Sequence, residues 1–411
     1  MLPGVFRGMF ASEPTGHTLI EMMSPEEQLE TLELGTAKIF SREELLEKLR
    51  TGKPLRAKLG VDPTAPDIHL GHTVVLEKLR QFQVLGHQAV LIIGDFTATV
   101  GDPTGRSSTR PPLTREEVLG NAETYTDQAF KILDRENTEV VYNGDWFRGM
   151  SYEEVLKLNA RVTMQQMLQR EDFRNRIEGN KEIRLHEIQY PVMQGWDSVE
   201  VRADVELGGT DQLFNILVGR DMQKSQEMAP QVAMCLPILE GTDGVRKMSK
   251  SYDNYIGVDE APAEMFGKAM SISDELMDRW YTLLLGGDRD LQLHPMEAKK
   301  QLAAQLVSRY HDDAASASAR ADFEAKFAKG DGDVNWPEVQ LGGERRLITS
   351  VAIAYRDGHG AERSNSDIRR LIQQGGVQLD GEKFSDPAAD LPDEISGRLF
   401  RLDKKRSVRL L

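Results

Sequence analysis

Two histidines stand three residues apart where a strand pattern gives way to a helix pattern. The segment His69-Leu70-Gly71-His72 follows Asp62-Pro63-Thr64 and opens a predicted helix over residues 71–85. The N-terminus of a helix presents free N–H groups and a partial positive charge, and both suit a polyphosphate. A histidine N–H can also stabilise charge that develops on phosphate oxygens. The pattern indicates a phosphate site, although a single histidine is more often an ordinary core or surface residue. Zinc is a weaker alternative, because no cysteine or third histidine is near.

A loop with two lysines is the second candidate. The segment Lys247-Met248-Ser249-Lys250-Ser251 follows the glycine-flanked turn Gly241-Thr242-Asp243-Gly244. Two lysines in a loop usually belong to a solvated turn. Beside a triphosphate, however, their ammonium groups would neutralise the charge of the phosphates. The combination of the two motifs, more than either alone, indicates a nucleotide site.

The segments between the motifs have the pattern of a parallel sheet with helical crossovers. Strands are predicted at residues 56–61, 88–93, 139–142, 200–207 and 232–239, with helices between them. This alternation is typical of an α/β fold, in which ligands bind at the carboxyl ends of the strands. The histidines follow an early strand and the lysines follow a late one. We therefore expect both motifs to line one crevice.

Composition places the chain among globular proteins with more than one domain. It has 411 residues, of which 39% are hydrophobic and 28% are charged. No apolar run reaches the ~18 to 20 residues of a membrane-spanning helix, and we expect no signal peptide. The single cysteine, Cys235, excludes internal disulfides and cysteine-rich zinc sites and suits a reducing compartment. We expect a cytoplasmic protein without a membrane partner.

The charge is unevenly distributed along the chain. The net charge is -15, which argues against a surface that binds nucleic acid everywhere. Residues 345–411 carry 13 Lys and Arg against 10 Asp and Glu, a balance of +3, so the preceding part carries -18. A mildly basic tail on an acidic body is compatible with a tail that contacts phosphates.

Taken together, the motifs resemble those of the class I aminoacyl-tRNA synthetases, and within that class the bacterial tyrosyl-tRNA synthetases with a K-M-S-K-S loop. The two class signatures correspond to residues 69–72 and 247–251. The tyrosyl family is also matched in order and spacing by Gly60-Val61-Asp62-Pro63-Thr64-Ala65, Ile93-Gly94-Asp95, Gly101-Asp102-Pro103-Thr104-Gly105, Tyr190-Pro191-Val192-Met193-Gln194-Gly195-Trp196-Asp197 and Leu207-Gly208-Gly209-Thr210-Asp211-Gln212. The resemblance runs from about Lys48 to the end. It implies that L-tyrosine is activated with ATP to tyrosyl-adenylate and then transferred to the 3′ end of tRNA(Tyr).

The resemblance also implies a role for each matching residue. Stabilisation of the transition state and of the leaving pyrophosphate would fall to Thr64, His69, His72, Lys247 and Lys250. ATP would be bound by Gly60, Asp62, His69, Gly71, His72, Gly208, Gly209, Asp211, Lys247, Met248, Ser249, Lys250 and Ser251. Tyrosine would be bound by Lys58, Asp95, Asp102, Tyr190, Gln194, Asp197 and Gln212. Mg²⁺ is implied as the companion of ATP, and no tightly bound metal is expected.

The tyrosine contacts divide by the part of the substrate that they would meet. Asp102, Tyr190 and Gln194 would bind the α-ammonium, and Gln212 would lie near the reacting carboxylate. Asp197 would accept a hydrogen bond from the phenolic O–H. Such an acceptor gives a selectivity for tyrosine over phenylalanine of ~10³ to 10⁵, because leaving a buried carboxylate without a hydrogen-bond partner costs free energy.

Lys58 departs from the best-known family pattern. Many tyrosyl enzymes have a second tyrosine at this position, beside the phenol. We interpret the lysine as a trait of a subgroup, and it leaves the phenol contacts open. Lys58 either lines the pocket or forms an ion pair with Asp95 or Asp197, and the role of Asp95 is likewise open.

The tail resembles an S4-type RNA-binding domain. Its motif runs from Asn365 through Gly375-Gly376 to Pro387. Ile368, Leu371 and Ile372 are predicted to form the apolar face of a helix, which leaves Arg369 and Arg370 exposed. Two exposed arginines more often form only a solvated face. In this motif context we predict that tRNA is contacted by Arg369, Arg370 and Lys383, through phosphates and shape more than base sequence.

The predicted organisation has five parts. Residues 1–24 are expected to be a disordered extension, and residues 25–257 a Rossmann-like catalytic domain. An insertion at about 145–190 is expected near the interface of a homodimer. An α-helical anticodon-binding domain (258–332), a linker (333–344) and a small α+β S4-like domain (345–411) follow. We expect no DNA partner.

Three alternative functions share some of these features. A tryptophanyl relative would have the same fold and loops, but Asp197, the segment 208–212 and the S4-like tail favour tyrosine. A smaller nucleotidyltransferase with an H-x-G-H loop would not need the helical and tail domains. An RNA-binding synthetase-like protein without catalysis is disfavoured by the presence of Asp102 and of both motifs.

Overall fold

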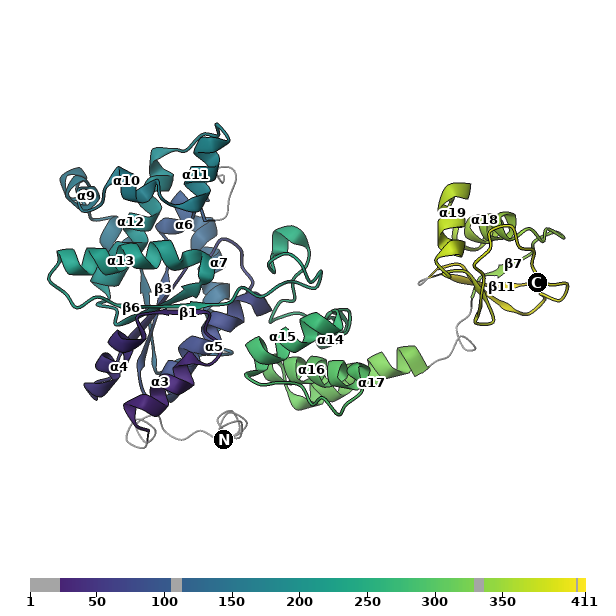
Figure 1. Cartoon of the computed structure of the whole chain (residues 1–411), viewed down its shortest axis with the longest axis horizontal. Helices are drawn as coiled ribbons and strands as arrows, with labels where there is room; N and C mark the ends of the chain where they lie inside the picture. Colours follow the sequence, from purple (N-terminus) through teal and green to yellow (C-terminus); the bar gives the residue numbers. More distant parts are fainter. Residues whose placement is uncertain (1–22, 105–112, 329–335, 404–405) are drawn as a thin grey trace. The chain divides into compact units, whose positions relative to one another are not determined.

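The computed structural model describes residues 23–104, 113–328, 336–403 and 406–411 (Figure 1). It divides into two compact units, Met1–Asp322 and Phe323–Leu411. The predicted extension at residues 1–24 lies outside the described part except for its last two residues. Ser24 is the N-cap of α3, and its side chain accepts from the N–H of Glu27.

The first unit is built on a sheet whose strands are parallel except at one edge. The strands are β1 (Lys38–Phe40), β2 (Arg56–Val61), β3 (Gln88–Ile93), β4 (Thr138–Tyr142), β5 (Val205–Gly209) and β6 (Val232–Leu236). Their order is β1-β6-β5-β2-β3-β4, and β1 alone runs antiparallel to its neighbour. Strands β3 and β6 are buried almost throughout, as expected of strands covered on both faces.

Helices cover both faces of this sheet. Figure 1 shows α3, α4 and α5 on one side and α12 and α13 on the other. The helices that precede β5 are α3 (Pro25–Glu33), α4 (Arg42–Arg50), α5 (Leu70–Val84), α6 (Thr97–Val100), α7 (Arg115–Ala129), α8 (Gly144–Phe147), α9 (Tyr152–Asn159), α10 (Met164–Met167), α11 (Glu171–Glu178) and α12 (Leu185–Glu200). Those that follow it are η1 (Thr210–Gln212), α13 (Leu213–Ser225), η2 (Lys250–Tyr252), α14 (Pro262–Met270), α15 (Asp274–Leu285), α16 (Pro295–Tyr310) and α17 (Asp313–Ala328).

The strand order fixes where a ligand can bind. From β2 the chain proceeds outward to β3 and β4, and it later returns to lay β5 on the other side of β2. The connections after β2 and β5 therefore leave the sheet in opposite directions, which opens a crevice at the carboxyl ends of these two strands. Asp62 follows β2 directly, and Gly208 and Gly209 end β5.

Most predicted elements are confirmed, and one is wrong. Strands β2 and β3 have the predicted bounds. The strand predicted at 200–207 is displaced, because α12 occupies residues up to Glu200 and β5 starts only at Val205. Pro191 lies inside α12. Strand β1 was not predicted.

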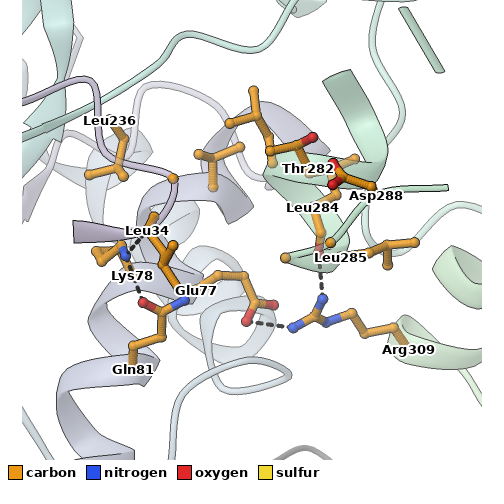
Figure 2. A pocket seen from close by; sticks show the side chains of 15 residues that line it. Leu34, Glu77, Lys78, Gln81, Leu236, Thr282, Leu284, Leu285, Asp288 and Arg309 are labelled. Atoms are coloured by element: carbon orange, nitrogen blue, oxygen red, sulfur yellow. Dashed lines mark hydrogen bonds and ion pairs between the residues drawn. The ribbon is translucent and has the colours of Figure 1, made fainter. Parts of the chain in front are cut away.

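The helices after the sheet pack against α5. Within the first unit, a second cavity lies between α5, the end of α15 and α16 (Figure 2). There Arg309 on α16 reaches Glu77 on α5 (Nη2 to Oε2, 2.6 Å) and the carbonyl of Leu284 (2.6 Å). On the same face of α5, Lys78 donates to the carbonyls of Leu32 and Leu34. These contacts anchor the helix that carries the two histidines at its N-terminus.

In its described residues, the second unit has a small sheet that shares one core with helices α18 (Leu347–His359) and α19 (Asn365–Gln373). Its strands are β7 (Glu338–Val339), β8 (Gln378–Leu379), β9 (Glu382–Lys383), β10 (Leu399–Arg401) and β11 (Ser407–Leu410), in the order β7-β11-β10-β8-β9. Because β7 pairs with β11, residues 338–339 belong to this sheet, although they fall in the predicted linker.

The tail residues predicted to bind tRNA are exposed in the second unit. Ile368 and Ile372 of α19 are buried, whereas Arg369 and Arg370 face solvent, as the apolar pattern predicts. Lys383 is exposed at the end of the β8–β9 hairpin. The two-residue turn of this hairpin has positive φ at Asp380 and Gly381, which is the conformation that Asp-Gly turns favour.

No helix in the described ranges is long and apolar enough to cross a membrane.

Candidate active site

A cavity of about 420 Å³ opens at the carboxyl ends of β2 and β5. Most of the residues predicted for the site line it. These are Gly60, Asp62, Thr64, His69, Gly71, His72, Asp102, Tyr190, Gln194, Asp197, Gly208, Gly209, Asp211, Gln212, Lys247, Met248 and Ser249. Four predicted residues, all within the described part, do not line it: Lys58, Asp95, Lys250 and Ser251.

The two histidines stack at the N-terminus of α5. Their ring centroids are 3.7 Å apart, and the backbone N–H of His69 donates to Nδ1 of His72 over 3.2 Å. Burial is the main cause that lowers the pKa of His69 to about 2 and that of His72 to about 4. The ammonium of Lys250 contributes to both shifts, and the neighbouring His72 contributes to that of His69. Both rings are therefore neutral near pH 7. Since Nδ1 of His72 accepts, its proton is on Nε2.

Gly71 lets the lysine loop approach the start of α5 closely. A Cβ at Gly71 would lie 3.0 Å from the His69 ring and 3.3 Å from Cβ of Met248. The Gly71 N–H points to Sδ of Met248 at 3.3 Å. Met248 thus occupies a backbone donor that a phosphate oxygen could otherwise take.

The two lysines of the loop are both near carboxylates. Nζ of Lys250 lies 2.5 Å from Oδ2 of Asp67, and Lys250 is not among the residues that line the cavity. Nζ of Lys247 lies 3.7 Å from Oδ2 of Asp211, inside the lining. In this conformation Lys247 is near its predicted place, whereas Lys250 is not.

A chain of hydrogen bonds joins the end of β2 to α6 and α12 in the cavity lining. The Tyr190 hydroxyl donates to Oδ2 of Asp62 (2.8 Å), and the Thr97 hydroxyl donates to Oδ1 (2.8 Å). Burial raises the pKa of Tyr190 well above its usual value, and the charges of Asp62 and Asp102 raise it further. Tyr190 therefore remains a neutral donor.

Asp102 and the two glutamines lie together on one wall. Nε2 of Gln212 donates to Oδ2 of Asp102 over 2.8 Å, and the Thr104 N–H donates to Oδ1 over 2.8 Å. Nε2 of Gln194 donates to Oε1 of Glu206 over 3.0 Å. This wall presents one carboxylate and two amide oxygens, a combination that suits an ammonium group.

Asp197 is a buried residue of the cavity lining. Trp146 Nε1 donates to Oδ1 over 3.0 Å, and Nδ2 of Asn143 approaches Oδ2 at 3.3 Å. Burial raises the pKa of Asp197 to about 7, although the charge of Lys58 and these two donors act in the opposite direction. The result is a buried oxygen acceptor that titrates near neutral pH.

The expected partners of Lys58 are wrong. Lys58 is fully buried under the cavity floor, and its ammonium donates to Oε1 of Glu206 (2.9 Å), to the Ser198 hydroxyl (2.8 Å) and to the Gln194 carbonyl (3.1 Å). Glu206 is its direct cross-strand neighbour in the β2–β5 pair. Lys58 thus holds α12 to the sheet and is not part of the pocket surface.

Both carboxylate oxygens of Asp95 are bound by groups of the protein. Arg148 Nη1 lies 2.7 Å from its Oδ2, and the Gly144 N–H donates to its Oδ1 over 2.7 Å. Asp95 is buried beside α8 and does not line the cavity. Its inclusion among the tyrosine contacts is not supported.

Several polar residues of the site were not predicted. Asn143, Thr97, Glu206, Asn215 and Arg170 all belong to its hydrogen-bond network. Asn143 directly follows β4, so the rule that ligands meet strand ends could have identified it. The other four carry no such signal in the sequence.

Comparison with known proteins agrees with this geometry. Residues 50–328 match the family model of class I tRNA synthetases (W and Y). A tyrosine--tRNA ligase of Aquifex aeolicus is 48% identical over 95% of this chain and 100% of its own length. One of Haemophilus ducreyi is 49% identical over 94% of this chain and 98% of its own length.

Solved structures show the same fold. A tyrosyl-tRNA synthetase of Archaeoglobus fulgidus complexed with L-tyrosine superposes with a TM-score of 0.58 over 72% of this chain and all of its own, at 23% identity. A C-terminally truncated mitochondrial tyrosyl-tRNA synthetase of Aspergillus nidulans gives a TM-score of 0.61 over 76% and 97% of the two chains, at 22% identity. The chain belongs to the class I tRNA synthetases of the W and Y family.

Proposed function

We infer that the chain is a tyrosine--tRNA ligase, which forms tyrosyl-adenylate from tyrosine and ATP and then charges tRNA(Tyr). The observation that carries this inference is the buried acceptor Asp197 in the lining of a cavity that residues of both signature motifs also line. A phenolic hydroxyl can donate to this oxygen, whereas a phenyl ring would leave it unpaired. Full-length relatives at about half identity carry the same activity in their names.

We propose the following division of roles within the cavity. The tyrosine ammonium is bound by the oxygens of Asp102, Gln194 and Tyr190, and its phenol by Asp197. The substrate carboxylate then attacks the α-phosphorus of ATP, and the bond to pyrophosphate breaks. No side chain needs to form a covalent bond, because positioning and charge stabilisation suffice.

At the other end, neutral His69 and His72 donate N–H groups toward phosphate oxygens, together with Thr64. The nucleoside would lie against the backbone of the glycines Gly60, Gly208 and Gly209. The carboxylate of Asp211 would bind it as well. ATP is expected to arrive as its Mg²⁺ complex. Lys247 and Lys250 complete the charge balance, and Lys250 must leave Asp67 to do so.

A tyrosine-dependent ATP–pyrophosphate exchange assay tests this function. Purified protein should exchange label with tyrosine and at least 10³-fold less efficiently with phenylalanine, since an unpaired buried acceptor disfavours it strongly. Tryptophan serves as the second comparison. Exchange with tryptophan alone would refute tyrosine as substrate, and exchange with none of the three would refute the enzyme.

We propose that the second unit is an S4-like domain that contacts tRNA. Its exposed Arg369, Arg370 and Lys383 support this, as does the basic balance of the tail. Replacing all three by alanine should leave exchange unchanged and weaken tRNA charging, with a reduced dependence of tRNA binding on salt. Charging at the normal rate would contradict the proposal. The helical domain predicted at residues 258–332 forms the anticodon-binding part in this proposal.

A homodimer and a cytoplasmic location are part of the same proposal. In the segment 145–190, large apolar side chains are exposed at Tyr152, Leu156, Met164 and Ile177, and Leu185 is 74% exposed. Exposed apolar groups gathered on one segment favour a protein interface. Light scattering after gel filtration should give twice the chain mass, and replacing Tyr152 and Leu156 by lysine should give a monomer.

A further inference from the structure

Asn215 is a buried amide that joins the two glutamines of the tyrosine site. It lies in the first turn of α13 and is 1% exposed. Its Nδ2 donates to Oε1 of Gln194 over 2.8 Å and to Oε1 of Gln212 over 3.2 Å. Both hydrogens of the Asn215 amide are therefore used within the protein.

The orientation of Asn215 is fixed from one side by Arg170. Nη1 of the buried Arg170 donates to Oδ1 of Asn215 over 3.0 Å. A guanidinium group can only donate, so it must meet the amide oxygen. The NH₂ group of Asn215 must then face the two glutamines, and each glutamine accepts a hydrogen bond from it with its amide oxygen.

The same orientation is fixed from the opposite side by two carboxylates. Nε2 of Gln212 donates to Asp102 over 2.8 Å, and Nε2 of Gln194 donates to Glu206 over 3.0 Å. Carboxylates can only accept when ionised, so they require the NH₂ ends of both glutamines. A flip of either amide would place two donors together at Asn215 and two acceptors together at the carboxylate.

We propose that Asn215, held by Arg170, is a positioning residue for tyrosine binding. This rests on the proposed function, in which the Gln194 oxygen accepts from the substrate ammonium. Asn215 uses one lone pair of that oxygen and keeps the other directed at the cavity. It likewise keeps the Gln212 amide turned toward Asp102. Asn215 touches no substrate itself but determines which atom of each glutamine does.

The test is an isosteric change from donor to acceptor. Asn215→Asp would place a carboxylate oxygen against two amide oxygens, so the glutamines must turn or lose their partners. In the exchange assay we expect KM for tyrosine to rise about tenfold or more, the size of effect that unpaired buried polar groups produce. KM for ATP should stay within about twofold.

A matched control is available on the same helix. Gln223 is fully buried on α13 and donates to the carbonyls of Ser198 and Ala203. Gln223→Glu makes the same amide-to-acid change and should lower thermal stability without raising KM for tyrosine selectively. If Asn215→Asp does not fold, Asn215→Ala serves instead, with the same direction expected.

The outcomes separate this proposal from the proposed function. An unchanged KM for tyrosine, an equal rise in KM for ATP, or the same selective change in Gln223→Glu would overturn the role of Asn215 while tyrosine activation stands. Wild-type protein that fails to exchange with tyrosine would overturn the function itself.

Discussion

The tyrosine end of the cavity is held by buried groups that already satisfy one another, whereas the lysine-loop end is held by contacts that must be exchanged. At the first end, Asp197, Gln194 and Gln212 each have fixed partners within hydrogen-bond distance. At the second, Lys250 is paired with Asp67, and Met248 occupies the Gly71 N–H. Selection of the substrate can therefore rely on a preformed pocket, and charge stabilisation requires a rearranged loop.

The difference also appears in exposure. Lys58 and Glu206, below the tyrosine end, have side chains that are 0% and 1% exposed, whereas Lys250 and Asp67 are 25% and 46% exposed. A buried ion pair cannot lose one partner without leaving an uncompensated charge. A half-exposed pair can separate cheaply, because water replaces the lost partner. The predictions below test this contrast in order of expected size.

The largest effect is expected for Lys58→Met, which removes the cation under the tyrosine end. Glu206 would remain buried without its ion-pair partner, which typically costs about 3 to 5 kcal/mol of unfolding free energy. Urea unfolding measures the loss. As a control, Lys48→Met breaks the more exposed pair with Asp204 and should cost at most about 1 kcal/mol. Equal losses would mean that the tyrosine end is not more tightly built than the surface.

Lys250→Ala should lower the rate of tyrosine activation by a factor of about 10² to 10³. This is the usual effect of removing one donor that stabilises transition-state charge. Pre-steady-state formation of tyrosyl-adenylate gives the rate, and equilibrium dialysis gives the tyrosine affinity, which should change by less than about twofold. Lys224→Ala, an exposed lysine on α13, is the control. A large loss of tyrosine affinity in Lys250→Ala would place Lys250 in the wrong part of the site.

Sequence patterns predicted the parts of the fold that depend on local chemistry. The local sequence was sufficient for the bounds of β2, which ends at Asp62-Pro63-Thr64, and of β3, which is an apolar run. The prediction failed for the region before β5. The apolar residues of α12 continue without a clear break to Val199 and Val201, and this pattern resembles a strand.

Residues of the cavity lining were predicted where they belong to sequence motifs. Residues whose role depends on their contact partners in the folded chain were not. Lining residues such as Asp102 and Tyr190 lie in recognisable segments. The partners of Lys58, Asp95 and Lys250 depend on which elements become neighbours in space, and Lys58 and Glu206 are 148 residues apart in the chain. The conformation of the lysine loop is likewise set by contacts with Asp67 and Gly71 that no sequence spacing reveals.

Asp197→Asn should separate stability from selectivity at the tyrosine end. The folded pKa of Asp197 is raised from 3.8 to about 7, so its ionisation destabilises the fold progressively between these two values as pH rises. The stabilising effect of Asn should thus be larger at pH 8 than at pH 5, by at most about 3 kcal/mol. Thermal unfolding at both pH values measures this difference.

The same variant should lose discrimination against phenylalanine in the exchange assay. In the wild type, KM for tyrosine should fall as pH rises through about 7, because the ionised carboxylate is the better acceptor for the phenol. Asn143→Ala changes a neighbour without removing the titrating group and should keep a pH-dependent KM. A KM that does not depend on pH in the wild type would contradict the role of Asp197.

The smallest effect is expected for Asp67→Asn, which releases Lys250 at the lysine-loop end. The pair is partly exposed, so it contributes at most about 1 kcal/mol, and its loss should raise the rate of adenylate formation by about twofold to fivefold. Single-turnover measurements at low salt show this best, because salt screens the pair in the wild type. Asp259→Asn, which removes an exposed partner of Lys131, is the control. A rate that falls, as in Lys250→Ala, would mean that Asp67 guides Lys250 into the transition state, and the lysine-loop end would then be as preorganised as the tyrosine end.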